Sequence, residues 1–122
     1  MSSPSLEKDQ RLKQKGWRRR YPRHRADLPV RLTALCEKGY ADITGRCSDI
    51  GRGGVGAVLT GEVPAGEVVS IEFRLAPSAA LLTTRAIVRY QRGFSHGLEF
   101  LSPSAEVQGV VDSFCAELEA ID

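Results

Sequence analysis

The sequence predicts an all-β domain with a C-terminal helix, and more specifically a six-stranded antiparallel β-barrel. Six short runs alternate apolar and polar residues and are separated by turn residues at near-regular spacing, which is typical of a barrel. A single terminal segment has helical spacing instead. At 122 residues the chain has room for one compact core. We expect the barrel domain to span residues 17–122, after a flexible basic leader at residues 1–16.

Each predicted strand places alternate residues on one face of the sheet. The runs lie at residues 30–36, 40–47, 55–59, 68–73, 82–90 and 95–100. Turn residues separate them, including a glycine cluster between the second and third runs and Gly93 before the last. In the fifth run, the residues predicted to share one face are Leu82, Thr84, Ala86, Val88 and Tyr90.

The segment after the last strand has the pattern of an amphipathic helix. Its apolar residues recur three or four positions apart: Val107, Val110, Val111, Phe114, Leu118 and Ile121. Ser102 is predicted to cap the helix, with Pro103 at its first position. This helix should pack over one end or side of the barrel.

The charges divide the chain into two unequal parts. Residues 1–25 hold nine Lys or Arg against two Asp or Glu, a net charge of +7. The remaining residues hold eight against thirteen, a net charge of −5. A basic leader on a mildly acidic domain indicates an anionic partner.

Composition and cysteine use indicate a cytoplasmic globular protein. Apolar residues make up 42% of the chain and charged residues 26%. No apolar run reaches the roughly 18 residues that cross a bilayer, and the first eleven residues lack the apolar stretch of a signal peptide. Three cysteines without a C-x-x-C pair, Cys36, Cys47 and Cys115, are interpreted as buried core thiols.

Residues 17–25 form an arginine-rich segment. Pro22 and Pro29 should keep it out of a helix, so that its arginines point outward. Guanidinium groups pair with phosphate oxygens and with the O6/N7 edge of guanine, and they stack on purines. The alternative is a solvated charge run that binds any polyanion.

Residues 49–54 form a second candidate segment, Asp-Ile-Gly-Arg-Gly-Gly. Its glycines allow a ligand close to the backbone, and the Asp49 carboxylate can accept hydrogen bonds from the N1 and N2 donors of guanine. The alternative is a tight loop between two strands, capped by Asp49. The segment is not a P-loop, because no Gly-Lys-Ser/Thr follows.

Taken together, the two segments resemble the PilZ domain family, whose paired motifs are R-x-x-x-R and [D/N]-x-S-x-x-G. Arg19-x-x-x-Arg23 is similar to the first motif, and Asp49-x-Gly51-x-x-Gly54 is similar to the second. Residues 28–30 resemble the family's entry into its first strand, and residues 97–100 resemble its last strand before a closing helix. The resemblance covers roughly residues 17–120.

The resemblance implies a PilZ-like split barrel that binds the signalling dinucleotide cyclic di-GMP (c-di-GMP) at its surface. Arg19 and Arg23 would contact phosphates and guanine, with Arg23 a candidate to stack on a base. Asp49 would bind a guanine edge, and Gly54 would let the loop close. Arg18 stands directly before the first motif, a place that in this family accompanies an intercalated ligand dimer.

One position departs from the family pattern. Gly51 stands where the family has serine, so a hydroxyl contact to the ligand is missing. A hydrogen bond to a charged group contributes about 1.5–3 kcal/mol, so the departure predicts weaker binding.

An enzyme is not expected, and neither is a metal or a cofactor. His24 and His96 are far apart in the sequence and have no obvious nucleophile or metal-ligand neighbour. The expected partners are c-di-GMP and a downstream protein, with no specific nucleic acid and no membrane insertion. Two alternatives remain: a non-specific nucleic-acid or membrane binder that uses the basic leader, and a degenerate PilZ fold that docks a protein through Phe114 and Leu118.

Overall fold

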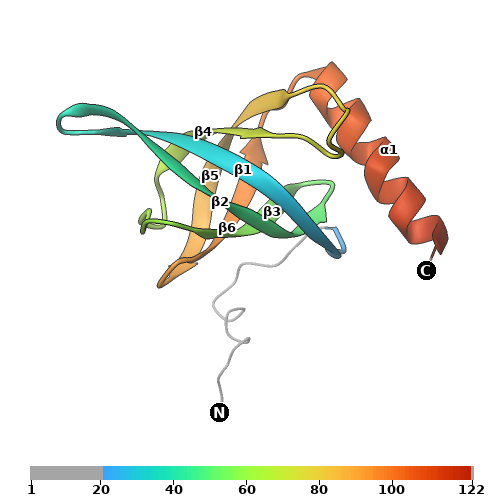
Figure 1. Cartoon of the computed structure of the whole chain (residues 1–122), viewed down its shortest axis with the longest axis horizontal. Helices are drawn as coiled ribbons and strands as arrows, with labels where there is room; N and C mark the ends of the chain where they lie inside the picture. Colours follow the sequence, from blue (N-terminus) through green and yellow to red (C-terminus); the bar gives the residue numbers. More distant parts are fainter. Residues whose placement is uncertain (1–20, 122) are drawn as a thin grey trace, which may run out of the picture.

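The structure is a computed structural model that describes residues 21–121, except for the side chains of residues 36, 120 and 121. Six antiparallel strands form a closed barrel, and one helix follows them (Figure 1). The elements are β1 (His24–Cys36), β2 (Gly39–Gly51), β3 (Gly54–Leu59), β4 (Val68–Phe73), β5 (Leu82–Arg92), β6 (Ser95–Leu101) and α1 (Ala105–Ile121). The predicted barrel with a C-terminal helix is confirmed.

The strands follow one another around the barrel in the order β1-β2-β3-β6-β5-β4. Closure comes from β4, which pairs with β1 from Val30↔Phe73 to Ala34↔Val69. β3 pairs with β6, although the two strands are distant in the sequence. This pairing brings the β2–β3 turn beside the last strand. Gly51 and Gly54 are cross-strand partners, so only Arg52 and Gly53 form this turn.

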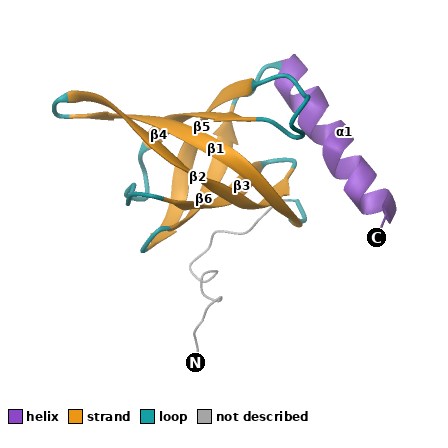
Figure 2. Ribbon diagram, viewed as in Figure 1, coloured by secondary structure: helices purple, strands orange, loops and turns teal. Residues whose placement is uncertain are grey.

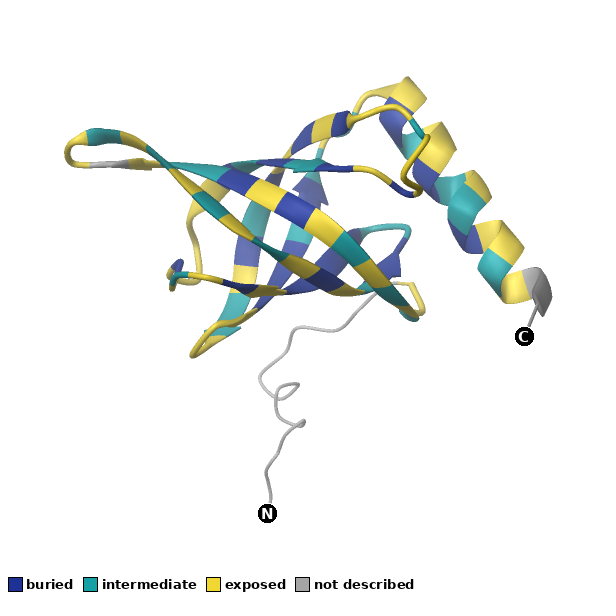
Figure 3. Ribbon diagram, in the orientation of Figure 1, coloured by how far each residue is buried: buried dark blue, intermediate teal, exposed yellow. Residues whose placement is uncertain are grey.

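Alternating residues of all six strands fill the barrel interior, as Figure 3 shows along β1. Phe73 and Phe100 stack inside it with ring centroids 5.9 Å apart. The buried apolar residues of the strands are Val30, Leu32, Cys47, Ile50, Val55, Ala57, Leu59, Val69, Ile71, Phe73, Leu82, Ala86, Val88, Leu98 and Phe100. This alternation is the signal from which the strands were predicted.

Helix α1 lies at one end of the barrel (Figures 1 and 2). Val107, Val111 and Cys115 are buried there, and Phe114 and Leu118 pack against the same core. The predicted N-cap at Ser102 is wrong. The helix begins at Ala105, and the backbone N–H of Val107 donates to Ser104 Oγ at 3.1 Å. Ser102 instead has a φ of 44° and turns the chain out of β6.

Three register shifts interrupt the barrel, between Arg25 and Leu28 in β1, between Cys47 and Asp49 in β2, and between Val88 and Tyr90 in β5. A bulge adds a residue to one strand and reverses which way later side chains point. The prediction that Tyr90 shares the inward face of Leu82–Val88 is therefore wrong. Tyr90 pairs with Gly97, which lies between the buried His96 and Leu98 and so faces outward.

Candidate ligand-binding site

Asp49 stands on the outer surface of the barrel near the end of β2. The register shift after Cys47 places it opposite Gly56 of β3, and its carboxylate lies directly above that glycine. A Cβ built on Gly56 would come within 2.5 Å of Asp49 Oδ2. The absence of a side chain at residue 56 therefore lets the carboxylate lie flat against the sheet.

Arg23 lies directly before β1 and folds onto Asp49. Its Nη1 donates to Asp49 Oδ1 at 2.5 Å, and the two side chains are 10% and 28% exposed. The expectation that the arginines of this segment point outward is therefore wrong at Arg23, because the carboxylate of β2 attracts its guanidinium to the barrel surface. The pair joins two segments that are 26 residues apart in the sequence.

Gly51 provides the space in which Arg23 lies. A Cβ built there would lie 2.6 Å from the carbonyl oxygen of Pro22 and 2.9 Å from Arg23 Cδ. Gly51 is buried at the end of β2. The space above residue 51 is thus taken up by the polypeptide just before β1.

Gly54 is required by the close approach of β3 to β6. A Cβ at this position would collide with the backbone carbonyl of Leu98. Gly54 pairs with Glu99, and Phe100 N–H donates to the carbonyl of Gly53 at 2.9 Å. These contacts fix the β2–β3 turn against the last strand.

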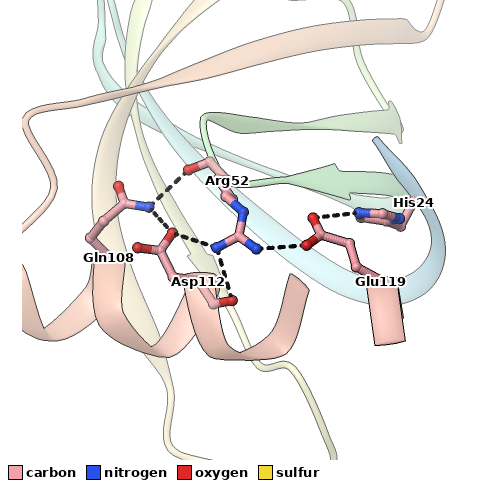
Figure 4. A network of polar contacts seen from close by, with 5 residues as sticks. All are labelled: His24, Arg52, Gln108, Asp112 and Glu119. Carbon is pink, nitrogen blue, oxygen red and sulfur yellow. Dashed lines mark hydrogen bonds and ion pairs between the residues drawn. The ribbon is translucent and has the colours of Figure 1, made fainter. Parts of the chain in front are cut away.

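Arg52, at the tip of this turn, connects the site to helix α1 (Figure 4). Its Nη2 donates to Glu119 Oε1 at 2.8 Å, and its Nη1 donates to the backbone carbonyl of Asp112 at 3.3 Å. Gln108 Nε2 in turn donates to the Arg52 carbonyl at 2.9 Å and to Asp112 Oδ1 at 2.7 Å. Helix α1 therefore holds the turn through both the side chain and the backbone carbonyl of Arg52.

Glu119 also joins the first residue of β1 to the same network. Its Oε2 lies 3.3 Å from His24 Nε2, as Figure 4 shows. The hydrogen bond from Arg52 lowers the pKa of Glu119, and the contact with His24 acts in the same direction. The end of α1 is thus fastened to both segments that form the site.

His96 and Cys47 are structural. His96 is 1% exposed, accepts a hydrogen bond from the Val63 N–H at 2.9 Å, and lies with Nδ1 2.8 Å from the Phe94 carbonyl oxygen. Burial raises the pKa of Cys47 to about 12, and the nearby Asp49 charge acts in the same direction. Cys115 is buried as well, so the prediction of core thiols is confirmed at residues 47 and 115. The side chain of Cys36 is not among those that the structure describes.

Of the predicted site residues, Arg23, Asp49, Gly51 and Gly54 come together at one place on the barrel. Arg18 and Arg19 lie outside the described residues. Sequence reasoning missed the role of Arg52, because this arginine occupies a variable position within the second motif. Nothing in the sequence pattern indicates that its partner is Glu119, 67 residues away.

Among the side chains that the structure describes within residues 21–121, which exclude Cys36, no three of His, Cys, Asp or Glu are grouped as metal ligands. The same part of the chain contains no helix with the length and hydropathy needed to cross a membrane.

The entry into β1 and the β2–β3 turn together form a candidate surface binding site on a small β-barrel. A guanidinium donates hydrogen bonds and carries positive charge, whereas the neighbouring carboxylate accepts hydrogen bonds. Such a pair suits a ligand that offers both anionic oxygens and N–H donors.

A family model described as the PilZ domain matches residues 18–117. The chain therefore belongs to the PilZ domain family. No curated protein gives a significant match.

Solved structures of PilZ-domain proteins share the fold. The Bacillus subtilis inhibitor of motility (MotI/DgrA) is similar with a TM-score of 0.68 and 24% identity, over 87% of this chain and 53% of that one. This chain thus spans about half the length of that protein. The PilZ domain of YcgR from Escherichia coli, solved with c-di-GMP, gives 0.63 and 21%, over 85% and 93%. The PilZ domain of CeSA from a cellulose-synthesizing bacterium gives 0.62 and 18%, over 80% and 98%.

Proposed function

We propose that this chain is a cytoplasmic, non-enzymatic receptor for c-di-GMP. The observation that carries the proposal is the ion pair between Arg23 and Asp49, which unites the two PilZ motifs in one polar surface. The family membership and the YcgR PilZ domain solved with c-di-GMP support the same ligand. The domain at residues 17–122 binds the ligand, with the basic leader at residues 1–16 before it.

Each motif residue has a role that fits its chemistry. Arg23, together with Arg19 and Arg18 from the segment before it, contacts phosphates and guanine. Asp49 accepts hydrogen bonds from the N1 and N2 donors of a guanine. Gly51 leaves the space in which Arg23 lies, and Gly54 lets the β2–β3 turn close against β6, so both glycines keep the ligand-contacting residues in place. The ligand binds as an intercalated dimer, for which Arg18 supplies the additional cation.

The composition of the site favours this ligand over a general polyanion. A surface that selects only phosphate charge gains nothing from a carboxylate, because like charges repel. Asp49 Oδ1 nevertheless lies 2.5 Å from Nη1 of Arg23, the motif arginine that the structure describes. A ligand with both phosphates and base donors uses both groups.

The proposed output is binding of a downstream protein. The sequence indicated a docking surface at Phe114 and Leu118. Both side chains pack against the barrel core, which gives no support to docking there.

The test is calorimetric titration of the parent protein with c-di-GMP, with cyclic di-AMP, GTP and a short DNA duplex as controls. Arg23→Ala should weaken c-di-GMP binding by about 30-fold or more, because a phosphate of the bound ligand then lacks its charged partner. Arg85→Ala, which removes the same charge from the exposed surface of β5, should leave the affinity unchanged. Equal binding of all four ligands, falling steeply with salt, would instead show a non-specific polyanion binder.

Stoichiometry tests the intercalated dimer. The parent should bind two c-di-GMP molecules per chain, and Arg18→Leu should bind one. Saturation of the parent at one ligand per chain would contradict the dimer and leave the receptor proposal standing.

A further inference from the structure

A row of outward-facing residues crosses four neighbouring strands beside the proposed site. Asp49 of β2 pairs with Gly56 of β3, Gly56 pairs with Gly97 of β6, and Gly97 pairs with Tyr90 of β5. Cross-strand partners point to the same side of a sheet. Asp49 and Tyr90 therefore lie on one surface, with two glycines between them.

Bulges set both ends of this row. The register shift between Cys47 and Asp49 turns Asp49 outward, and the shift between Val88 and Tyr90 does the same for Tyr90. Without the second shift, the alternation of β5 would send the tyrosine into the core. Bulges are concentrated next to binding sites because they redirect single side chains in this way.

The two glycines let both side chains lie across the sheet. The Asp49 carboxylate lies above Gly56, and the Tyr90 ring lies above Gly97, where Cδ2, Cε2 and Cζ occupy the space of a Cβ. Cα atoms of directly opposed residues in antiparallel strands are about 4.5–5.5 Å apart. The carboxylate and the phenol ring thus lie over adjacent positions on the barrel surface.

We propose that Tyr90 is the stacking platform for a guanine base, whose N1 and N2 donors reach Asp49. This rests on the proposed function and adds to it a ligand-binding residue outside both motifs. A half-buried ring that lies along the surface can stack on a base, whereas a ring that stands on edge cannot. Stacking accepts any base, and the adjacent carboxylate selects guanine.

The carboxylate of this row has different neighbours on its two sides. Arg23 holds Asp49 from one side, at the entry into β1, and Tyr90 lies on the other side of it. A base that stacks on Tyr90 can therefore point its N1 and N2 donors toward Asp49.

The test compares three variants with the parent by calorimetric titration with c-di-GMP. Tyr90→Phe keeps the ring and should bind within about twofold of the parent, because stacking needs no hydroxyl. Tyr90→Leu still covers Gly97 but should bind about 5- to 150-fold more weakly, the range that a lost base–aromatic stack corresponds to. Tyr40→Leu, the same change at a residue 77% exposed on the β1–β2 hairpin, should bind like the parent.

A second measurement follows the ligand-bound state of the parent protein itself. The chain has three tyrosines, so labelling with 3-fluorotyrosine gives three ¹⁹F resonances, assigned with Tyr→Phe variants. On addition of c-di-GMP, ring current from a stacked base should shift the Tyr90 resonance and leave the Tyr40 resonance in place.

The outcomes separate the two proposals. A parent that does not bind c-di-GMP overturns both. A parent that binds, with an unchanged Tyr90→Leu affinity and an unshifted Tyr90 resonance, overturns the platform alone. Weak binding of both Tyr90→Leu and Tyr90→Phe also overturns it, since the hydroxyl and not the ring would then be the contact.

Discussion

Restoring the family's serine at residue 51 should damage this protein. In Gly51→Ser the new Cβ would lie 2.6 Å from the Pro22 carbonyl oxygen and 2.9 Å from Arg23 Cδ. Arg23 can move only by straining its ion pair with Asp49, and the carbonyl can move only with the start of β1. The substitution therefore adds the hydroxyl but displaces Arg23.

The magnitude follows from two opposing effects. Overpacking a filled site costs about 1–3 kcal/mol, and replacing glycine returns about 0.4–1 kcal/mol through the entropy of the unfolded chain. The backbone of Gly51 is not among the residues with positive φ, so no strain is added there. A net loss of about 1.3 kcal/mol corresponds to a fall in melting temperature of about 5–10 °C.

Thermal unfolding followed by circular dichroism measures this loss, and titration with c-di-GMP measures the effect on the site. Gly109→Ala is the matched control, because a Cβ at this exposed helical position meets nothing within 4 Å. It should raise stability by about 0.5–1 kcal/mol. A Gly51→Ser protein that melts at or above the parent temperature, or that binds c-di-GMP more tightly than the parent, would refute the reasoning.

Three further outcomes are expected from the contacts of α1 and the buried thiols. Arg52→Ala should speed amide hydrogen exchange in the last two turns of α1 and not in the barrel strands. Equal exchange rates of these helical amides in the parent and the variant would contradict this. The pKa of Glu119 is lowered, so its contribution to stability is present above the ordinary value of about 4.3 and is lost as the pH falls through the lowered value. Glu119→Gln should flatten the pH dependence of the melting temperature below about pH 4, and parallel curves would count against the assigned contacts. In a Cys36→Ser protein, Cys47 and Cys115 should react with a thiol reagent at pH 8 only after unfolding, because burial raises the pKa of both thiols; rapid labelling of the folded protein would disprove their protection.

The strands and the helix could be predicted because each element has a local periodic pattern. Val30 and Leu32 alternate with exposed neighbours, and Val107 and Val111 recur at helical spacing. Burial on one face imposes these periods on the sequence directly. The helix start was missed, because Ser102 and Ser104 are both plausible caps and only the turn after β6 decides between them.

The candidate site could be located from its motifs, but not assembled from them. The spacing of the motifs indicated that Arg23 and Asp49 act together. It did not indicate that Arg23 lies across Gly51, since that depends on the path of the chain into β1. Nor does any local pattern pair Arg52 with Glu119.

The sequence by itself determined the barrel, its strand order along the chain, the amphipathic helix and the two motifs proposed to bind the ligand. Only the tertiary structure decided which way individual side chains point. Bulges in β2 and β5 turn Asp49 and Tyr90 to the outer surface, and glycines at residues 56 and 97 give both side chains room to lie there. The physical reason is that a one-residue bulge reverses the alternation of a strand without leaving a local signal, because it is fixed by pairing with a neighbouring strand.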